Sequence, residues 1–345
     1  MAILFLESFE WLPTGVNSTA LNNRLLEKYS TSNFSFSSSI LNFNGSRNLE
    51  LNTNNGLTTK PLIDLDPARD TLTVGMQVRT STNFANINSS FLVIVSDGTT
   101  TSANVRVSTT GEILLYRGGT FLVNTGVRLS LNTSYYIETQ FKIDNAGRFE
   151  LRLNNQQVYV NENVDLDPGP VKTGWDRVRW QGIGNNEFID NMYITDNQGT
   201  TNTGFLGPIA VDYLVPNGDG DSSEWTPSQG TENYLMVDDA TLDADSTFVS
   251  SSTSGELDLY EITDIPAAST PIIGFQVVHT LRADSGPVNI SSVVRSGSTD
   301  ITESLGEISN GSYFCYLSHF SSSPTSGQFW TDDEINSIQV GIQID

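Results

Sequence analysis

Polar and apolar residues alternate most regularly between residues 135 and 160, where the chain reads YYIETQFKIDNAGRFELRLNNQQVYV. Alternation with a period of two is typical of a strand with one buried face. The turn-forming stretches 144–147 and 154–155 interrupt the pattern, and Phe149 and Leu151 resume it after the first turn. The segment therefore predicts consecutive antiparallel strands joined by tight turns.

Similar runs, separated by Gly, Asn, Asp or Pro, recur along the whole chain. Helical spacing of leucines occurs only at 20–29, and a helical turn or two is predicted near 332–337. Strands are predicted at 2–7, 40–44, 47–51, 71–80, 90–96, 102–108, 112–117, 120–123, 134–144, 148–154, 157–161, 176–182, 187–195, 233–237, 257–262, 272–282, 287–294, 298–304, 312–318 and 337–344. We therefore expect an all-β protein.

The length of 345 residues favours two domains. The stretch 197–207, NQGTTNTGFLG, lacks apolar alternation and is typical of a linker. We expect an N-terminal jelly-roll sandwich at 1–200 and a smaller β-sandwich-like domain at 205–345.

Charge and composition narrow the class of partner. The net charge is −23, and the few basic residues are scattered singly, so direct nucleic-acid binding is not expected. The first residues lack a basic region, and no segment approaches the ~20 apolar residues of a membrane span, so we expect neither a secretory signal nor membrane insertion.

Cys315 is alone, which excludes a disulfide framework. His279 and His319 lie in or near apolar runs without a nucleophile elbow, and we expect packed histidines.

Several segments of the first 200 residues carry a family resemblance. They are LFLESFE at the start, TLTVGMQVR at 71–79, GEILLYRGG at 111–119, the 135–160 meander and FIDNMYITD at 188–196. Their order resembles the concanavalin A-like (laminin G-like) jelly roll. That resemblance implies the sandwich fold and leaves the function open.

The second half resembles the region that follows such a jelly roll in structural proteins of tailed-bacteriophage virions. The matching features are the Gly-Asp-rich loop with a Trp at 217–225, DLYE at 258–261 and the closing strand at 330–341. The resemblance implies a virion component assembled in the host cytoplasm, on the tail or adsorption apparatus or on the capsid exterior. Its partners would be other virion proteins, with 205–345 serving attachment or homo-oligomerisation, and trimers follow by family analogy.

A glycan hydrolase on this fold would need two carboxylates on one face. Asp165 and Asp167 have the right spacing but precede the turn residues 168–170, and Glu187 and Asp190 fall on opposite faces of a strand. We therefore predict a structural protein without enzymatic activity. A glycan hydrolase is the weakest of the functions considered.

An acidic loop in the second half offers a candidate calcium site. Asn217, Asp219, Asp221 and Glu224 space oxygen ligands like those of a calcium-binding loop. Serine replaces both the glycine and the final glutamate of an EF-hand. A looser calcium site and a solvated turn without any cofactor both stay open.

Aromatic residues suggest an alternative function in carbohydrate binding, because an aromatic ring matches the apolar face of a pyranose. The candidates are Trp175 and Trp180, flanked by polar residues, together with Tyr135 and Tyr136. The alternative is a carbohydrate-binding adhesin or receptor-binding module that recognises a host surface glycan.

Overall fold

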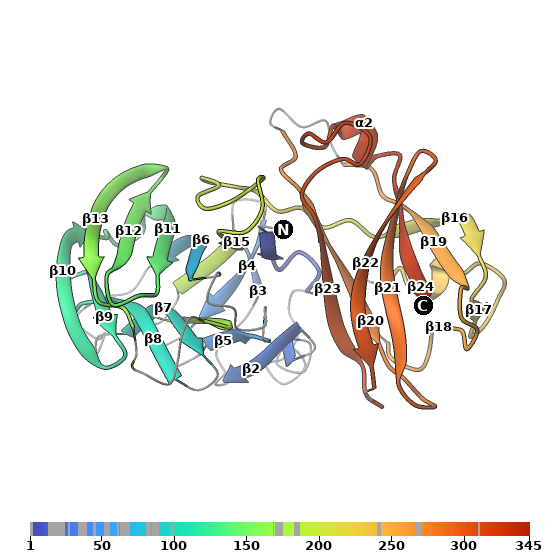
Figure 1. The fold of residues 1–345 in the computed structure, drawn as a ribbon, viewed down its shortest axis with the longest axis horizontal. Helices are drawn as coiled ribbons and strands as arrows, with labels where there is room; N and C mark the ends of the chain where they lie inside the picture. The colour runs from blue at the N-terminus through green and yellow to red at the C-terminus, as the bar shows by residue number, and fades with distance from the viewer. Residues whose placement is uncertain are drawn as a thin grey trace. The chain divides into compact units, whose positions relative to one another are not determined.

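The computed structural model describes residues 3–12, 25–26, 28–33, 40–43, 46–51, 56–60, 62, 70–80, 84, 90–97, 100–167, 169, 175–182, 187–239, 243–265, 271–309 and 311–345. The chain divides into two compact units, Met1–Val211 and Asp212–Asp345. Strands make up most of the regular structure in both units (Figure 1), which confirms the all-β class. The first unit extends past the predicted boundary at 200–205 because residues 206–211 pack against its sheet.

Two antiparallel sheets form the first unit. One has eight strands in the order β13-β12-β11-β6-β15-β4-β3, with β1 beside β15, and the other has seven in the order β10-β9-β8-β7-β14-β5-β2. Neighbours such as β6 and β11 are far apart in sequence, as the crossovers of a jelly roll require. The strands are β1 (Ile3–Glu7), β2 (Tyr29–Asn33), β3 (Ile40–Phe43), β4 (Ser46–Leu51), β5 (Gly56–Thr59), β6 (Thr71–Thr80), β7 (Ser90–Asp97), β8 (Thr100–Val107), β9 (Glu112–Arg117), β10 (Thr120–Arg128), β11 (Ser134–Lys142), β12 (Gly147–Leu153), β13 (Gln156–Val164), β14 (Arg177–Gln181) and β15 (Glu187–Asp196).

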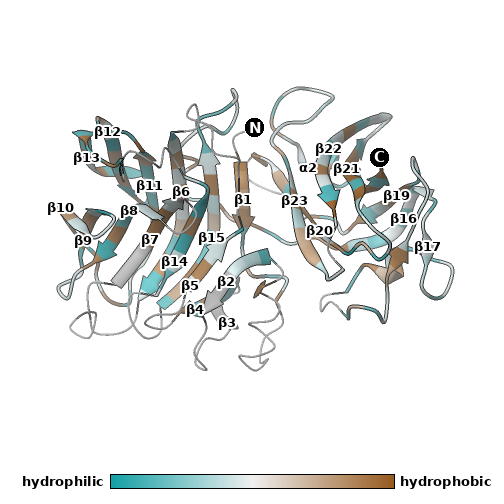
Figure 2. Cartoon of the chain, turned by 60° about the horizontal axis from the view of Figure 1, so that its bottom comes forward, coloured by the Kyte–Doolittle hydropathy of each residue, from teal (hydrophilic) through white to brown (hydrophobic). Residues whose placement is uncertain are grey.

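The core of the first unit lies between these sheets. Phe5 of the eight-stranded sheet and Trp180 of the seven-stranded sheet are both buried, with ring centroids 5.7 Å apart. On β6, Leu72, Val74 and Met76 alternate with residues of the opposite face and are fully buried. All five residues of β1 are buried, and the strand is brown over most of its length in Figure 2. Period-two alternation therefore assigns one face of β6 to the core, whereas β1 is buried along its whole length.

A buried ion pair fixes the end of β1. Lys28 Nζ lies 2.9 Å from Glu7 Oε2, and both side chains are almost completely buried. The Tyr29 hydroxyl donates to the same oxygen, while Phe9 N and Trp11 Nε1 donate to Oε1. The desolvation of Glu7 is thus offset by a full set of donors.

The second unit contains a five-stranded antiparallel sheet in the order β16-β19-β24-β21-β22 and the two-stranded pairs β20-β23 and β17-β18. Its core includes Val294, Phe320, Trp330 and Ile335. The elements are β16 (Pro216–Ser223), β17 (Thr226–Pro227), η2 (Tyr234–Met236), β18 (Val249–Ser250), β19 (Leu257–Ile262), β20 (Phe275–Leu281), β21 (Val288–Ser296), β22 (Thr299–Ile308), β23 (Phe314–Phe320), α2 (Asp332–Ile335) and β24 (Gln339–Ile344).

Four local predictions differ from the structure. Strands β2 and β5 were not predicted, and the loop predicted at 217–225 is largely strand β16. Residues 234–236 form a 3-10 helix instead of a strand. Most of the helix predicted at 20–29 lies outside the described residues; residues 25, 26 and 28 are helical as predicted, whereas residue 29 belongs to β2.

In the described part of the chain, no helix has the length and apolar character needed to cross a bilayer.

Candidate functional site

The face of the eight-stranded sheet that points away from the core carries a set of polar side chains. On β11, Ile137, Thr139 and Phe141 face the core, so Glu138 and Gln140 project from the other face. Gln140 stands opposite Thr73 on β6 and Glu150 on β12, and Glu138 stands opposite Arg152. Residues directly opposite in adjacent strands interact, so this register gathers the polar groups on one surface.

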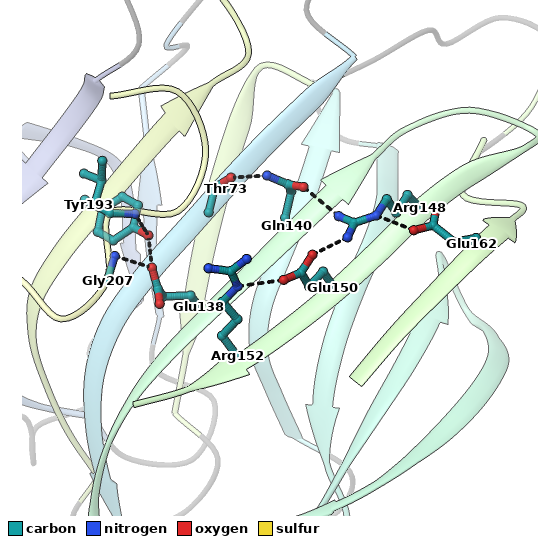
Figure 3. A network of polar contacts seen from close by, with 10 residues as sticks. Thr73, Glu138, Gln140, Arg148, Glu150, Arg152, Glu162, Tyr193 and Gly207 are labelled. Atoms are coloured by element: carbon teal, nitrogen blue, oxygen red, sulfur yellow. Dashed lines mark hydrogen bonds and ion pairs between the residues drawn. The ribbon is translucent and has the colours of Figure 1, made fainter. Parts of the chain in front are cut away.

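These side chains form a continuous network (Figure 3). Gln140 Nε2 donates to the Thr73 hydroxyl at 3.0 Å, and Gln140 Oε1 accepts from Arg148 Nη1 at 2.8 Å. Arg148 also donates to Glu150 Oε2, and its Nε donates to Glu162 Oε1 at 2.7 Å. We call the residues Thr73, Gln140, Arg148, Glu150, Arg152 and Glu162 the polar row.

Burial within the polar row is uneven. The Glu150 side chain is 3% exposed, whereas those of Arg148 and Arg152 are 28% and 29% exposed and that of Glu162 is 60% exposed. Desolvation opposes the charged form of Arg148, but the hydrogen bonds that it donates to Glu162 and Glu150 outweigh this effect and raise its pKa. A buried carboxylate therefore fixes two guanidinium groups that stay partly exposed.

A second polar group lies beside the row, on β11 and β15. The Tyr193 hydroxyl donates to Glu138 Oε1, which also accepts from Gly207 N at 2.8 Å (Figure 3). Glu138 is completely buried, and its Oε2 has no hydrogen-bond partner among the described residues. Burial raises the pKa of Tyr193 well above its usual value, and Glu138 raises it further, so this hydroxyl keeps its proton at neutral pH.

The predicted aromatic platform does not form. Trp175 and Trp180 are completely buried, because β14 and the segment just before it contribute to the core between the sheets. A ring without exposed surface cannot stack on a sugar, so the prediction for both tryptophans is corrected. Tyr136 is also buried and donates to the Asn191 carbonyl, while the half-buried Tyr135 accepts a bond from Ser130 N.

The candidate calcium ligands do not converge on one point. Asp219 accepts from Tyr234 N, Asp221 lies 3.7 Å from an Arg295 nitrogen, and Glu224 accepts from Leu257 N. Asn217 lies with them on or just after strand β16 but is exposed. Across the described residues, no group of three or more His, Cys, Asp or Glu side chains is arranged to hold a metal. The loop-type site predicted from spacing is corrected, because an extended strand separates its ligands.

Of the carboxylates considered for hydrolysis, Glu187 and Asp190 are both buried on β15, and other carboxylates were missed. Asp165 and Asp167 accept backbone bonds within a turn. Glu138 and Glu150 were overlooked because they lie on neighbouring strands, where they share a face but are two residues out of direct opposition. The signal that reveals them is the alternation of 136–142 and 148–152, read together across the turn at 144–147.

Comparison with known proteins finds similar solved structures but no family. A PL-14 alginate lyase from Aplysia kurodai is 12% identical with a TM-score of 0.41, covering 56% of this chain and 98% of that one. The alginate lyase Aly36B, solved as a mutant with alginate tetrasaccharide, is 13% identical with a TM-score of 0.38, covering 55% and 95%. Domain 4 of AbnA, a GH43 arabinanase from Geobacillus stearothermophilus solved with arabinotriose, is 14% identical with a TM-score of 0.37, covering 56% and 93%. No protein-family profile and no curated protein matches the sequence.

These structures correct the prediction that the chain is not an enzyme. The similar solved structures include polysaccharide lyases and a domain of a glycoside hydrolase, at 12–14% identity. The search for an Asp pair also missed Glu138, Glu150 and Tyr193, which project from one sheet face.

Proposed function

We propose that the first unit binds carbohydrate, and that the polar row of the eight-stranded sheet holds it. The observation that carries this proposal is the fixation of Arg148 and Arg152 by the buried Glu150. Sugar hydroxyls are recognised by planar polar side chains, and guanidinium groups form strong, directional bonds. Side chains that are already ordered lose little entropy when a ligand binds.

Charge balance supports an uncharged saccharide as the ligand. Within the polar row, the charges of Arg148 and Arg152 are matched by those of Glu150 and Glu162. The whole chain carries a net charge of −23, which repels polyanions. Among the saccharides of the similar solved structures, we propose that arabinotriose resembles the ligand more than the acidic alginate tetrasaccharide does.

Calorimetric titration with arabinotriose and alginate tetrasaccharide tests the proposal. Replacement of Arg148 or Arg152 by Ala should weaken binding about tenfold or more, because a hydrogen bond to a charged group contributes about 1.5–3 kcal/mol. Arg295→Ala is the matched control, since Arg295 pairs with Asp300 in the second unit. Equal binding by Arg148→Ala and wild type would refute the proposal.

Cleavage of the bound saccharide is a second candidate, favoured by Glu138 and Tyr193 beside the polar row. A protonated phenol and a buried carboxylate are a donor and an acceptor for proton transfer. The same titration mixtures can be assayed for new reducing ends and for unsaturated products. Glu138→Gln should abolish any turnover while it leaves binding at Arg148 intact.

The setting of this activity is proposed from the sequence resemblance alone. It is the particle of a tailed bacteriophage, on the tail, the adsorption apparatus or the capsid exterior, with other virion proteins as partners and homo-oligomers such as trimers. A carbohydrate-binding unit there would contact a glycan of the host surface. Mass spectrometry of purified particles should find the chain at fixed stoichiometry, and its absence from them would contradict this setting.

A further inference from the structure

Residues 204–211 cross the outward face of the eight-stranded sheet without joining it as a strand. Side chains of the sheet hold the backbone of this segment at four points, much as a binding site holds a ligand. The bonds are Thr195 Oγ1 to the Gly204 carbonyl (2.7 Å), Leu206 N to the Tyr193 hydroxyl (3.0 Å), Gly207 N to Glu138 Oε1 (2.8 Å) and Val211 N to Asn191 Oδ1 (2.9 Å).

Apolar contacts add to these bonds without burying the segment completely. Its three aliphatic side chains stay partly exposed, and they pack on a small cluster of the sheet face. The side chains Leu206, Ile209 and Val211 cover Ile3, Leu6, Tyr136 and Tyr193. The segment is therefore held by a modest amount of apolar area, and it has no regular secondary structure of its own.

The segment also reaches the polar row. The Arg152 guanidinium carbon lies 3.8 Å from the centroid of the Phe205 ring. The same guanidinium donates to Glu150 through Nε. Any movement of Phe205 away from the sheet would therefore uncover one of the two arginines that we assign to saccharide binding.

The Glu138 carboxylate lies beneath the segment, and only one of its two oxygens accepts hydrogen bonds from described residues. Glu138 Oε1 accepts two donors, whereas Oε2 is buried and has no partner among the described residues. A buried acceptor without a donor is costly, and a sugar hydroxyl would supply the donor. On β15, the Asn191 side chain offers a further acceptor and the Thr195 hydroxyl a further donor to the same segment.

We propose that residues 204–211 act as a strap over a second part of the saccharide-binding face, and that saccharide and strap compete for the four side chains beneath it. The proposal rests on the proposed function of the polar row. A longer saccharide would occupy the polar row first and then displace the strap. Opening of the strap should therefore strengthen binding, since the closed state lowers the apparent affinity.

Leu206→Ser and Phe205→Ala each weaken the strap without altering a side chain of the sheet. Hydrogen exchange of the Leu206, Gly207 and Val211 amides reports whether the strap has opened, and in Leu206→Ser the residue 206 amide is followed. Calorimetry with the two oligosaccharides named above then measures affinity. Leu235→Ser, at an exposed leucine of the second unit, is the matched control, and circular dichroism checks that each variant is folded.

We expect faster exchange at these amides in at least one variant and, in that variant, binding about threefold tighter or more. The proposal is overturned if neither variant speeds exchange, or if an opened variant binds no more tightly than wild type. If only the strap proposal is wrong, the wild type still binds saccharide and Arg148→Ala still weakens that binding. Failure of the proposed function is recognised separately, because wild type then binds neither oligosaccharide or binds equally well without Arg148.

Discussion

Arg152 Nε donates to Glu150 Oε1 at 2.6 Å, and the two residues lie two positions apart on β12. Arg148, two positions before Glu150, donates to its other oxygen. Side chains at i and i+2 of a strand share a face, so one carboxylate can bridge both neighbours. Because Glu150 is nearly buried, the arrangement of both arginines depends on it.

Replacement of Glu150 by Gln should lower the free energy of unfolding by about 1–3 kcal/mol, because two guanidinium groups lose a charged partner in a desolvated place. Urea unfolding of the wild type and the variant measures the change. Glu162→Gln is the control, since an exposed pair contributes only about 0–1 kcal/mol. Equal losses in the two variants would show that the buried position of Glu150 is unimportant.

The two tryptophans predicted to bind glycan should instead determine stability. Trp180→Ala removes a fully buried ring that packs against Phe5, and we expect a loss of about 3–5 kcal/mol. Where the variant still folds, saccharide affinity measured at low temperature should match that of wild type. A stable variant with specific loss of saccharide binding would restore the platform interpretation.

Strands with a clear period of two were predictable from the sequence. The ranges predicted for 71–80, 112–117 and 187–195 agree with β6, β9 and β15 to within a residue. β5 and β16 were missed because GLTT and PNGDGDSS have too few apolar residues to show alternation. β5 pairs with β14 and β2, and β16 pairs with β19. No local sequence pattern reveals such pairing between strands.

The candidate site was less predictable because its residues meet through register and not through spacing. Gln140 contacts Thr73, which lies 67 positions away, and Tyr193 contacts Glu138 across 55 positions. A charged residue within an alternating strand predicts a solvated face, and this interpretation holds for Glu162 but not for the buried Glu138. The polar residues beside Trp175 and Trp180 likewise predicted exposed rings, although both rings are buried.

The stability of the first unit should depend on pH through Glu7. Desolvation by burial favours its neutral form, but Lys28 and the hydrogen bonds outweigh it and lower the Glu7 pKa below its usual 4.5. A lowered folded-state pKa contributes stability above about pH 4.5, and this stability is lost as the pH falls below that value. Glu7→Gln should therefore cost about 3–5 kcal/mol at pH 7.

The difference between wild type and Glu7→Gln should shrink when urea unfolding is repeated near pH 3. Lys28→Met removes the partner charge and serves as the matched variant, since it leaves the Glu7 carboxylate buried without a cation. A difference that stays constant between pH 7 and pH 3 would contradict a lowered pKa for Glu7.

The second unit should become less stable in weak acid because of His279. The ring lies on the same face of β20 as Val277 and Leu281, which are partly buried against the core, and its Nε2 lies 2.8 Å from Ser292 Oγ. Desolvation lowers its pKa from 6.5 to about 4. Between these two pH values, His279 is protonated in the unfolded chain but neutral in the folded unit. The free energy of unfolding therefore falls as the pH falls, by at most about 1.4 kcal/mol per pH unit.

Differential scanning calorimetry at pH 6.5 and 4.5 measures this effect, with His279→Gln as the comparison. The wild-type transition of the second unit should move to lower temperature at pH 4.5, and that of the variant should move less. Identical shifts in the two proteins would assign the acid sensitivity to other groups.

The central claim is that saccharide contacts the polar row, and nuclear magnetic resonance of the arginine Nε–Hε groups tests it most directly. Addition of arabinotriose should shift the signals of Arg148 and Arg152 in a saturable manner and leave those of Arg117 and Arg295 unchanged. Saturable shifts at Arg117 or Arg295 with none at Arg148 or Arg152, or no shift at any arginine up to the solubility of a panel of neutral and acidic oligosaccharides, would contradict the claim.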